Sequence, residues 1–175
     1  KDLVWKLCFE LAQVEERAGN YARARAAYAR SAVVCASNLR WKVWLGGART
    51  EVSAGRFDTA AELLGRALRA SPPKTSSSVL LDQARLHELS GDAERARRLL
   101  RAACRTNPQE WKVYLELVLI ELRRGNRERA LANVRRALAR HPGTGRLWAM
   151  LIQLELREGP HEQMRTFQQA LLEVP

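Results

Sequence analysis

Apolar and polar residues alternate along the chain with the period of an α-helix, and single glycines interrupt the pattern. Before Gly125, for example, apolar side chains occupy positions 115, 118, 119 and 122. This spacing places them on one face of a helix. Glycine ends a helix readily because it adopts the left-handed backbone conformation without steric cost. The pattern therefore predicts short amphipathic helices that end at glycine turns.

The glycine turns recur at spacings of 36, 36, 34 and 34 residues, which identifies an internal repeat. The turn glycines are Gly19, Gly55, Gly91, Gly125 and Gly159. Five residues after them the chain places Ala24, Ala60, Ala96, Ala130 and, as the exception, Met164. Twelve residues after them it places Ser31, Ala67, Ala103, Ala137 and Leu171. Five copies with this many matching positions predict a repeated structural unit.

Each copy is predicted to form two helices, one on each side of its glycine. Proline closes three of the second helices, and an Asn or Asp within three residues of the glycine can cap their starts. The candidate caps are Asn20, Asp58, Asp92 and Asn126. No copy can bury its apolar face alone, so neighbouring copies are expected to stack into one domain over residues 1–175. The expected copies span about 1–36, 37–73, 74–108, 109–142 and 143–175.

Two further repeated positions identify the kind of repeat. Four residues before the glycine stand Glu15, Glu51, Glu121 and Glu155, with His87 as the exception. Eleven residues before it stand Cys8, Trp44, Leu80, Tyr114 and Trp148. The segments WLGGARTEVSAG and WAMLIQLELREG, and second helices such as ARAAYAR and ARRLLRA, resemble the half-a-TPR (HAT) family of the tetratricopeptide-like superfamily. An ordinary tetratricopeptide motif tends to place an aromatic residue where this chain has glutamate.

The resemblance covers the whole chain and implies an all-α fold, a right-handed α-α superhelix of five helix pairs. It also implies that Trp44, Tyr114, Trp148 and the four glutamates are structural. A buried carboxylate needs donors or a cation, and Arg25, Arg30, Arg66 and Arg136 of the second helices are candidates. The third copy lacks both the tryptophan and the glutamate. Its polar entry, residues 71–78, predicts a longer loop, a bend or a divergent repeat.

The phrases WKLC, WKVW and WKVY begin three first helices and pair a tryptophan with a lysine. Trp5, Trp41 and Trp111 are expected in the core between copies rather than as surfaces for base stacking. The resemblance implies that first helices line a concave surface. On that surface, thirteen or six residues before the glycine, the cationic positions are Lys6, Lys42, Lys112, Arg146, Arg49 and Arg85. They predict a row of basic side chains at equivalent positions of successive repeats, a basic ladder, that would bind RNA or an acidic peptide. The alternative is that these side chains are solvated and extend over the tryptophan rings.

The net charge is +11, from 30 Lys and Arg against 19 Asp and Glu, and indicates an anionic partner, with nucleic acid first. Only five of the 30 are lysine, so the arginine content could instead reflect a GC-rich genome. The three cysteines form no paired motif and are expected to be reduced thiols. No P-loop, dinucleotide motif, nucleophile–base pair or metal-ligand spacing is recognised, so no enzyme activity, cofactor or metal is expected. No apolar run is long enough to predict a membrane span.

The resemblance implies a non-enzymatic scaffold of an RNA-processing assembly, such as splicing, RNA 3′-end or ribosomal RNA processing, or organellar transcript stabilisation. Its expected partners are proteins of that assembly, and its expected location is the nucleus, with a chloroplast or other organelle as the alternative. Direct binding of single-stranded RNA is the alternative function, and a bacterial-type adaptor a weaker third. Because residue 1 is Lys, we expect a piece of a longer array, whose apolar C-terminal face at Leu171 and Leu172 could dock further repeats or form a homodimer.

Overall fold

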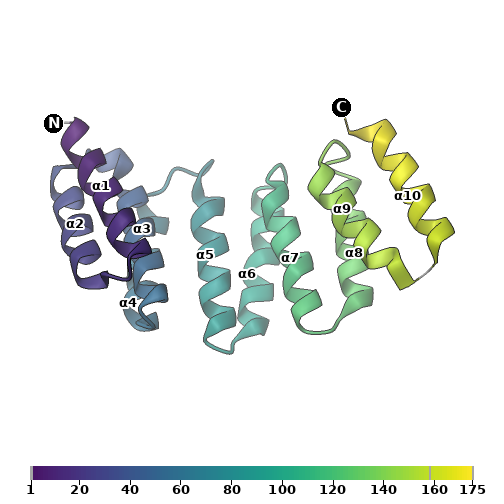
Figure 1. Ribbon diagram of the computed structural model, residues 1–175, viewed down its shortest axis with the longest axis horizontal. Helices are drawn as coiled ribbons and strands as arrows, with labels where there is room; N and C mark the ends of the chain where they lie inside the picture. Colours follow the sequence, from purple (N-terminus) through teal and green to yellow (C-terminus); the bar gives the residue numbers. More distant parts are fainter. Residues whose placement is uncertain (1, 158, 175) are drawn as a thin grey trace. The chain divides into compact units, whose positions relative to one another are not determined.

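The computed structural model describes residues 2–157 and 159–174, and in this part of the chain it contains ten α-helices and no strand (Figure 1). The helices are α1 (Asp2–Arg17), α2 (Tyr21–Val34), α3 (Arg40–Ser53), α4 (Phe57–Ala70), α5 (Ser76–Leu89), α6 (Ala93–Thr106), α7 (Trp111–Arg123), α8 (Arg127–Leu138), α9 (Gly145–Leu154) and α10 (Pro160–Glu173). Two 3-10 turns, η1 (Ser37–Leu39) and η2 (Glu155–Arg157), precede α3 and follow α9. The predicted class, an all-α array of five helix pairs, is confirmed.

The glycine turns have the backbone geometry that the sequence predicts. All five turn glycines have positive φ, from 73° at Gly55 to 114° at Gly159. In the first copy the Gly19 N–H donates to the Glu16 carbonyl (2.9 Å) and the Asn20 N–H to the Glu15 carbonyl (2.8 Å). The same pair of hydrogen bonds recurs in copies two to four. These bonds satisfy the carbonyls that are left over at a helix C-terminus.

The candidate caps behave differently from the prediction at three of four positions. Only Asp92 caps its helix, where its Oδ1 accepts the Arg95 N–H at 2.9 Å. Asn20 and Asn126 make no side-chain cap, and Asp58 lies inside the first turn of α4. The amides of Asn20 and Asn126 instead donate to the carboxylates of Glu15 (2.8 Å) and Glu121 (3.1 Å). The hydrogen bond to a charged carboxylate is stronger than one within the helix cap, so these asparagine side chains bind the glutamates and do not cap the helices.

The second helix of the fifth copy is shifted by one residue relative to the spacing from the turn glycine that the other copies follow. Helix α10 begins directly after Gly159, at Pro160, whereas the other second helices begin two residues after their glycine. Ala170, and not Leu171, therefore takes the small buried position: Ala170 is 8% exposed and Leu171 is 65% exposed. Proline at the first helical position explains the early start, because its fixed φ suits that position.

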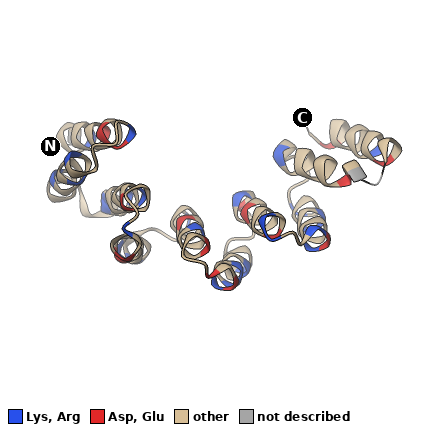
Figure 2. Cartoon of the chain, turned by 60° about the horizontal axis from the view of Figure 1, so that its bottom comes forward, with Lys and Arg blue, Asp and Glu red and all other residues tan. Residues whose placement is uncertain are grey.

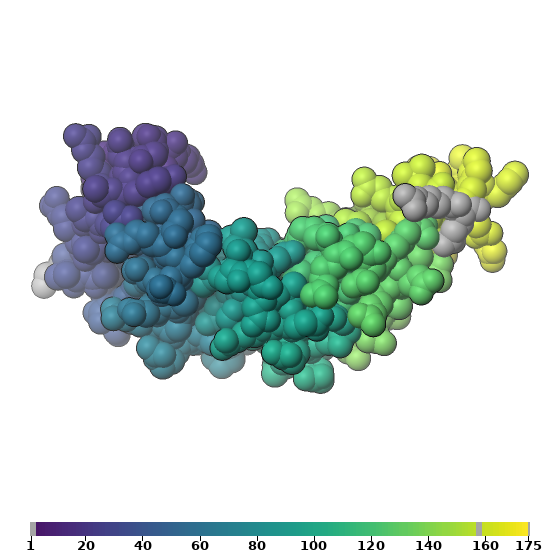
Figure 3. Space-filling view, turned by 90° about the horizontal axis from the view of Figure 1, so that it is seen from below, coloured from purple at the N-terminus to yellow at the C-terminus, as the bar shows by residue number. Residues whose placement is uncertain are grey.

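The chain forms two compact units, residues 1–96 and 97–175, and each is described by itself. In unit 1 the helices α1 to α5, and in unit 2 the helices α7 to α10, each pack against the next helix along the chain. Figure 3 shows the surface of the chain, coloured by residue number. In unit 1 the core lies between successive helices, with Trp5, Tyr28 and Val43 in one cluster and Trp41, Leu64 and Val79 in the next. In unit 2 one cluster includes Val118, Val134, Leu147 and Trp148. The repeated alanines Ala24, Ala60 and Ala130 are fully buried, as close helix approach requires.

The third copy is a divergent repeat with ordinary helices. Helix α4 ends at Ala70 and α5 begins at Ser76, so only residues 71–75 link them. The link is a turn in which the Thr75 N–H donates to the Pro72 carbonyl (2.9 Å). Val79, in the first turn of α5, is fully buried. The polar entry is therefore neither a long loop nor a break in the array.

Candidate functional site

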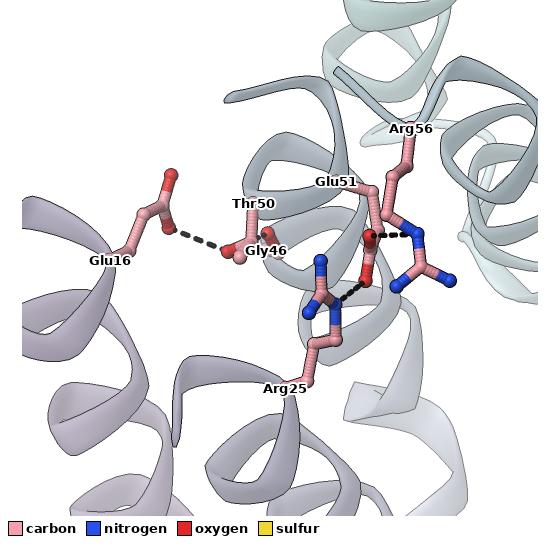
Figure 4. A network of polar contacts seen from close by, with 6 residues as sticks. All are labelled: Glu16, Arg25, Gly46, Thr50, Glu51 and Arg56. Atoms are coloured by element: carbon pink, nitrogen blue, oxygen red, sulfur yellow. Dashed lines mark hydrogen bonds and ion pairs between the residues drawn. The ribbon is translucent and has the colours of Figure 1, made fainter. Parts of the chain in front are cut away.

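Three of the four repeated glutamates bind an arginine of the preceding copy. Glu51 on α3 is 4% exposed, and its Oε1 accepts the Nε–H of Arg25 on α2 at 2.7 Å (Figure 4). Arg56 lies on the other side, with its Nε 3.4 Å from Oε2. Helix α2 belongs to the first copy and α3 to the second, so this pair joins two copies. Two cations offset the cost of burying the carboxylate.

The same arrangement occurs twice in unit 2. Glu121 on α7 is fully buried, 2.8 Å from the Nε of Arg97 on α6. Glu155, after α9, accepts from Arg135 Nη2 on α8 (3.1 Å) and from Thr166 Oγ1 on α10 (2.5 Å). Each arginine again comes from the second helix of the preceding copy. In these copies the repeated glutamate thus joins one copy to the copy before it.

Helix rotation decides which arginines reach a glutamate. Arg25 and Arg97 stand six residues after their glycine and Arg135 stands ten after its own, one helical turn further along the same face. The candidates Arg30, Arg66 and Arg136 stand eleven residues after it and are exposed. Of the four arginines considered from sequence, only Arg25 makes this pair.

Two copies lack this pairing. Glu15 is bound within its own copy, by Asn20 (2.8 Å) and by Arg23 at 3.9 Å. In the third copy His87 replaces the glutamate, and burial is the main cause that lowers its pKa. The second copy has Ala61 and Gly65 at the two positions where an arginine would stand. The carboxylate and its cation are therefore absent together.

A groove on the first helices of unit 1 contains several of the predicted concave positions. Lys42 and Arg49 of α3 line a pocket of about 450 Å³, together with Gln13 and Arg17 of α1 and Ser78 of α5. Its apolar lining is Phe9, Tyr28, Trp41 and Leu45. An apolar pocket of about 260 Å³ continues between α3 and α5, lined by Val52, Leu64, Leu86 and Leu89. We call these two pockets the unit 1 groove.

The charges in the unit 1 groove are mixed. Arg49 Nε donates to Asp82 Oδ2 at 2.6 Å, and Arg85 Nη1 lies 3.5 Å from the other oxygen of Asp82. Lys42 Nζ lies 5.7 Å from the centroid of the Trp41 ring, within the range of a cation–π contact. Glu16 lines the same groove and accepts the Thr50 hydroxyl at 2.9 Å. A carboxylate therefore accompanies the cations that the sequence places here.

The remaining cations of the predicted ladder lie elsewhere. Lys6 is exposed on α1. In unit 2, Lys112 Nζ and Arg146 Cζ each lie 5.9 Å from the centroid of the Trp111 ring. Lys42 and Lys112 thus each lie over the tryptophan that precedes them in the sequence. A ladder that connects all six cations stays a prediction.

The tryptophans and tyrosines occupy positions between helices. Trp5 and Trp41 are buried, as their phase in the repeat predicts, and Trp111 is half-buried. Trp148 and Tyr114 are buried and Trp44 is half-buried. The Trp148 indole donates to the Pro142 carbonyl at 2.6 Å, and the Tyr114 hydroxyl to the Cys104 carbonyl at 3.2 Å.

A close contact between Tyr28 and Gly46 was not foreseen from sequence. A Cβ at Gly46 would lie 2.7 Å from Cε1 of the Tyr28 ring, so the ring occupies the space of a side chain. Burial, and then the charge of Glu16, raises the pKa of Tyr28 to about 12. The available signal was the pair Gly46–Gly47 inside a helix, where glycine has an entropic cost.

The described residues hold no group of three or more His, Cys, Asp or Glu side chains that could bind a metal ion. Within the same residues, no helix has the length and apolar character needed to cross a membrane.

Helix pairs with glycine turns, small residues at the helix contacts and a groove on the first helices define a tetratricopeptide-like repeat, a class of scaffold for protein interactions. The family model of the PRP6 TPR-like domain matches residues 1–175, and the chain belongs to this family. Comparison with curated proteins finds no match.

Solved structures with the same fold include several tetratricopeptide repeat proteins. A MamA crystal structure is 16% identical, with a TM-score of 0.60, and covers 99% of this chain and 93% of its own. A tetratricopeptide repeat protein from Parabacteroides merdae is 16% identical, with a TM-score of 0.63, over 98% of this chain and 66% of its own. YrrB, described as having an unusual peptide-binding site, is 14% identical, with a TM-score of 0.53, over 94% and 83%. These similarities establish the fold.

Proposed function

We propose that this chain is a non-enzymatic scaffold of an RNA-processing assembly, in the first place a nuclear splicing complex, and that it holds partner proteins. The match to the PRP6 TPR-like domain along all 175 residues supports the assembly. The arrangement of helix pairs supports the scaffold role, because stacked repeats present long surfaces to partners.

The observation that carries the protein-binding role is the mixed charge of the unit 1 groove. Arg49 and Arg85 share one carboxylate, Asp82, and an apolar pocket lies beside them. The five first helices together carry nine cationic and nine acidic residues, a net charge of zero. The unit 1 groove itself is lined by four cations, Arg17, Lys42, Arg49 and Arg85, and by two carboxylates, Glu16 and Asp82. A groove of mixed charge with apolar pockets and fixed polar groups suits a peptide better than a polyanion.

The test compares two charge-reversed variants of the tagged protein in its own cells. The variant Lys42→Glu, Arg85→Glu alters the unit 1 groove, and Arg30→Glu, Arg66→Glu makes the same charge change at exposed positions of the second helices. We expect splicing-complex proteins to co-purify with the wild type and the control and to be reduced with the groove variant. Equal loss in both variants would contradict the groove, and association with no RNA-processing complex would contradict the assembly.

Direct binding of single-stranded RNA is the second candidate, favoured by the six exposed cations of the predicted ladder. It is tested by titrating mixed-sequence single-stranded RNA into the protein at several salt concentrations. If RNA is the ligand, binding falls steeply with salt and is lost in the variant Lys6→Glu, Lys42→Glu, Lys112→Glu. Absence of binding at low salt would eliminate this candidate.

A further inference from the structure

The excess positive charge of the chain lies on the second helices. They carry fifteen cationic and six acidic residues, a net charge of +9, whereas the first helices are neutral. Helix α6 alone has five arginines and one glutamate, and α8 has four arginines and one glutamate (Figure 2). The positive charge available for an anion is therefore concentrated on α6 and α8.

Some of these arginines have a structural task. Arg97 and Arg135 pair with the buried Glu121 and Glu155, and Arg127 donates to the Leu154 carbonyl. Another set lines a pocket of about 580 Å³ formed by α6, α7 and α8 and the residues that follow α6 and α8. This set is Arg101, Arg105, Arg136 and Arg140, and we call the site the arginine pocket.

No acidic residue lines the arginine pocket among the described residues. Of these four arginines, Arg101 has its Nη2 4.0 Å from Oε1 of Glu121, a carboxylate that Arg97 already binds. Asn133 also lines the pocket, and its buried Nδ2 has no hydrogen-bond partner in the part of the chain that the structure describes. A buried donor without an acceptor is costly, and an anion in the pocket would supply one.

Cys104 lines the same pocket, and the positive charge of the surrounding arginines affects the pKa of its thiol. Burial raises the pKa of Cys104 to about 11, and Arg105, Arg136 and Arg140 oppose that rise. Three guanidinium groups are therefore close enough to stabilise negative charge at one point.

We propose that the arginine pocket binds a phosphorylated serine or threonine of a partner protein. Arginine matches a phosphoryl group with two parallel hydrogen bonds, and arginine clusters are a recurring way to recognise phosphorylated peptides. The site is separate from the unit 1 groove and does not depend on it.

The environment of Tyr114, the aromatic residue that lines the pocket, favours a phosphopeptide over RNA as the ligand. Single-stranded RNA is usually held by stacking its bases on exposed aromatic rings. Tyr114 is 5% exposed, its ring meets His141 edge-on at 5.3 Å, and its hydroxyl donates to the Cys104 carbonyl. No ring face is therefore available for a base in this pocket, whereas a single phosphoryl group needs only the arginines.

The test measures fluorescence anisotropy with a short labelled Gly/Ser/Ala peptide that carries one central phosphoserine. Probes for comparison are the same peptide without phosphate and mixed-sequence single-stranded RNA. The pocket variant is R105Q/R136Q, and the matched control is R98Q/R129Q, which removes the same charge from exposed positions of the same two helices. Circular dichroism establishes that both variants fold.

We expect the phosphopeptide to bind, and its affinity to fall by about tenfold or more in the pocket variant but by less than about threefold in the control. Chemical shifts of the Asn133 side-chain amide should move when the wild type is titrated with phosphopeptide, a readout that needs no variant. Equal weakening in both variants, or equal binding of the unphosphorylated peptide, would overturn the proposal. RNA binding that outcompetes the phosphopeptide and depends on the pocket arginines would also overturn it.

Discussion

Two junctions between copies in unit 1 solve the same packing problem with different chemistry. Where α2 meets α3, the half-buried Arg25 binds the buried Glu51, and the apolar Val43 is buried. Where α4 meets α5, Val79 occupies the position of Val43, but His87 stands in place of the glutamate. Helix α4 has Ala61 and Gly65 at the two positions from which an arginine pairs in other copies. Both valines are at most 1% exposed. The apolar contact is therefore common to both junctions. The glutamate and its arginine are either both present or both absent.

The difference has an energetic meaning. A buried ion pair repays little more than its own desolvation, whereas a buried charge that has lost its partner is strongly destabilising. A junction can thus lack both charges at little cost, but it cannot lack one of them. Four predictions test this comparison, from the largest expected effect to the smallest.

The apolar contact should dominate the stability of the α4–α5 junction. Leu64 on α4 is 1% exposed and packs in the same cluster as Val79 and Leu86. The variant Leu64→Ala should lower the free energy of unfolding by about 3 kcal/mol, from lost burial and the cavity that remains. Urea unfolding measures the change. A loss below about 1 kcal/mol would mean that the junction is not held by its apolar core.

Removing one charge should be costly at the α2–α3 junction. Arg25→Met leaves Glu51 buried with only Arg56 beside it, and we expect a loss of about 2 kcal/mol. The double variant Arg25→Met, Glu51→Leu copies the apolar character of the α4–α5 junction and should recover most of that loss. Arg30→Met, at an exposed position of the same helix, is the control. A double variant less stable than Arg25→Met would show that the pair contributes net stability.

Two glycines inside helices should respond in opposite directions to the same change. Gly46→Ala places a Cβ 2.7 Å from the Tyr28 ring, so it should destabilise the α2–α3 junction by about 1–2 kcal/mol. Gly65→Ala on α4 meets only the end of the Arg69 side chain at 3.6 Å, and should stabilise by about 0.5–1 kcal/mol through helix propensity. Thermal unfolding of both variants gives the signs. Stabilisation by Gly46→Ala would contradict the close contact.

The smallest effect concerns pH. Burial raises the pKa of Tyr28 from 10.0 in the unfolded chain to about 12 in the fold, so the folded state holds this proton more tightly. The contribution of protonated Tyr28 to the free energy of unfolding is fully present below pH 10 and is lost as the pH rises through about 12. Ultraviolet titration of tyrosinate in the wild type and in Tyr28→Phe isolates the group. A Tyr28 titration at its ordinary value would contradict its buried place beside Gly46.

The comparison also explains which parts of the site were predictable. The repeat, its glycine turns and the glutamate positions follow from periodic sequence, because each copy must present the same backbone turn and apolar face. The partner of each glutamate did not follow from sequence. Arg135 and Arg136 are neighbours on α8, and only the rotation of that helix against α9 selects Arg135.

What the sequence determined by itself was local: where helices end, which residues face a neighbour, and which repeat family the chain resembles. These features depend on backbone conformation and on a short period, both of which are written in consecutive residues. The tertiary structure alone decided the use of Asn20 and Asn126 as donors to carboxylates and the sharing of Asp82 by two arginines. It also decided the arginine pocket on α6 and α8. Charges far apart in sequence interact only after helix packing fixes their distance, and packing geometry is not periodic in the sequence.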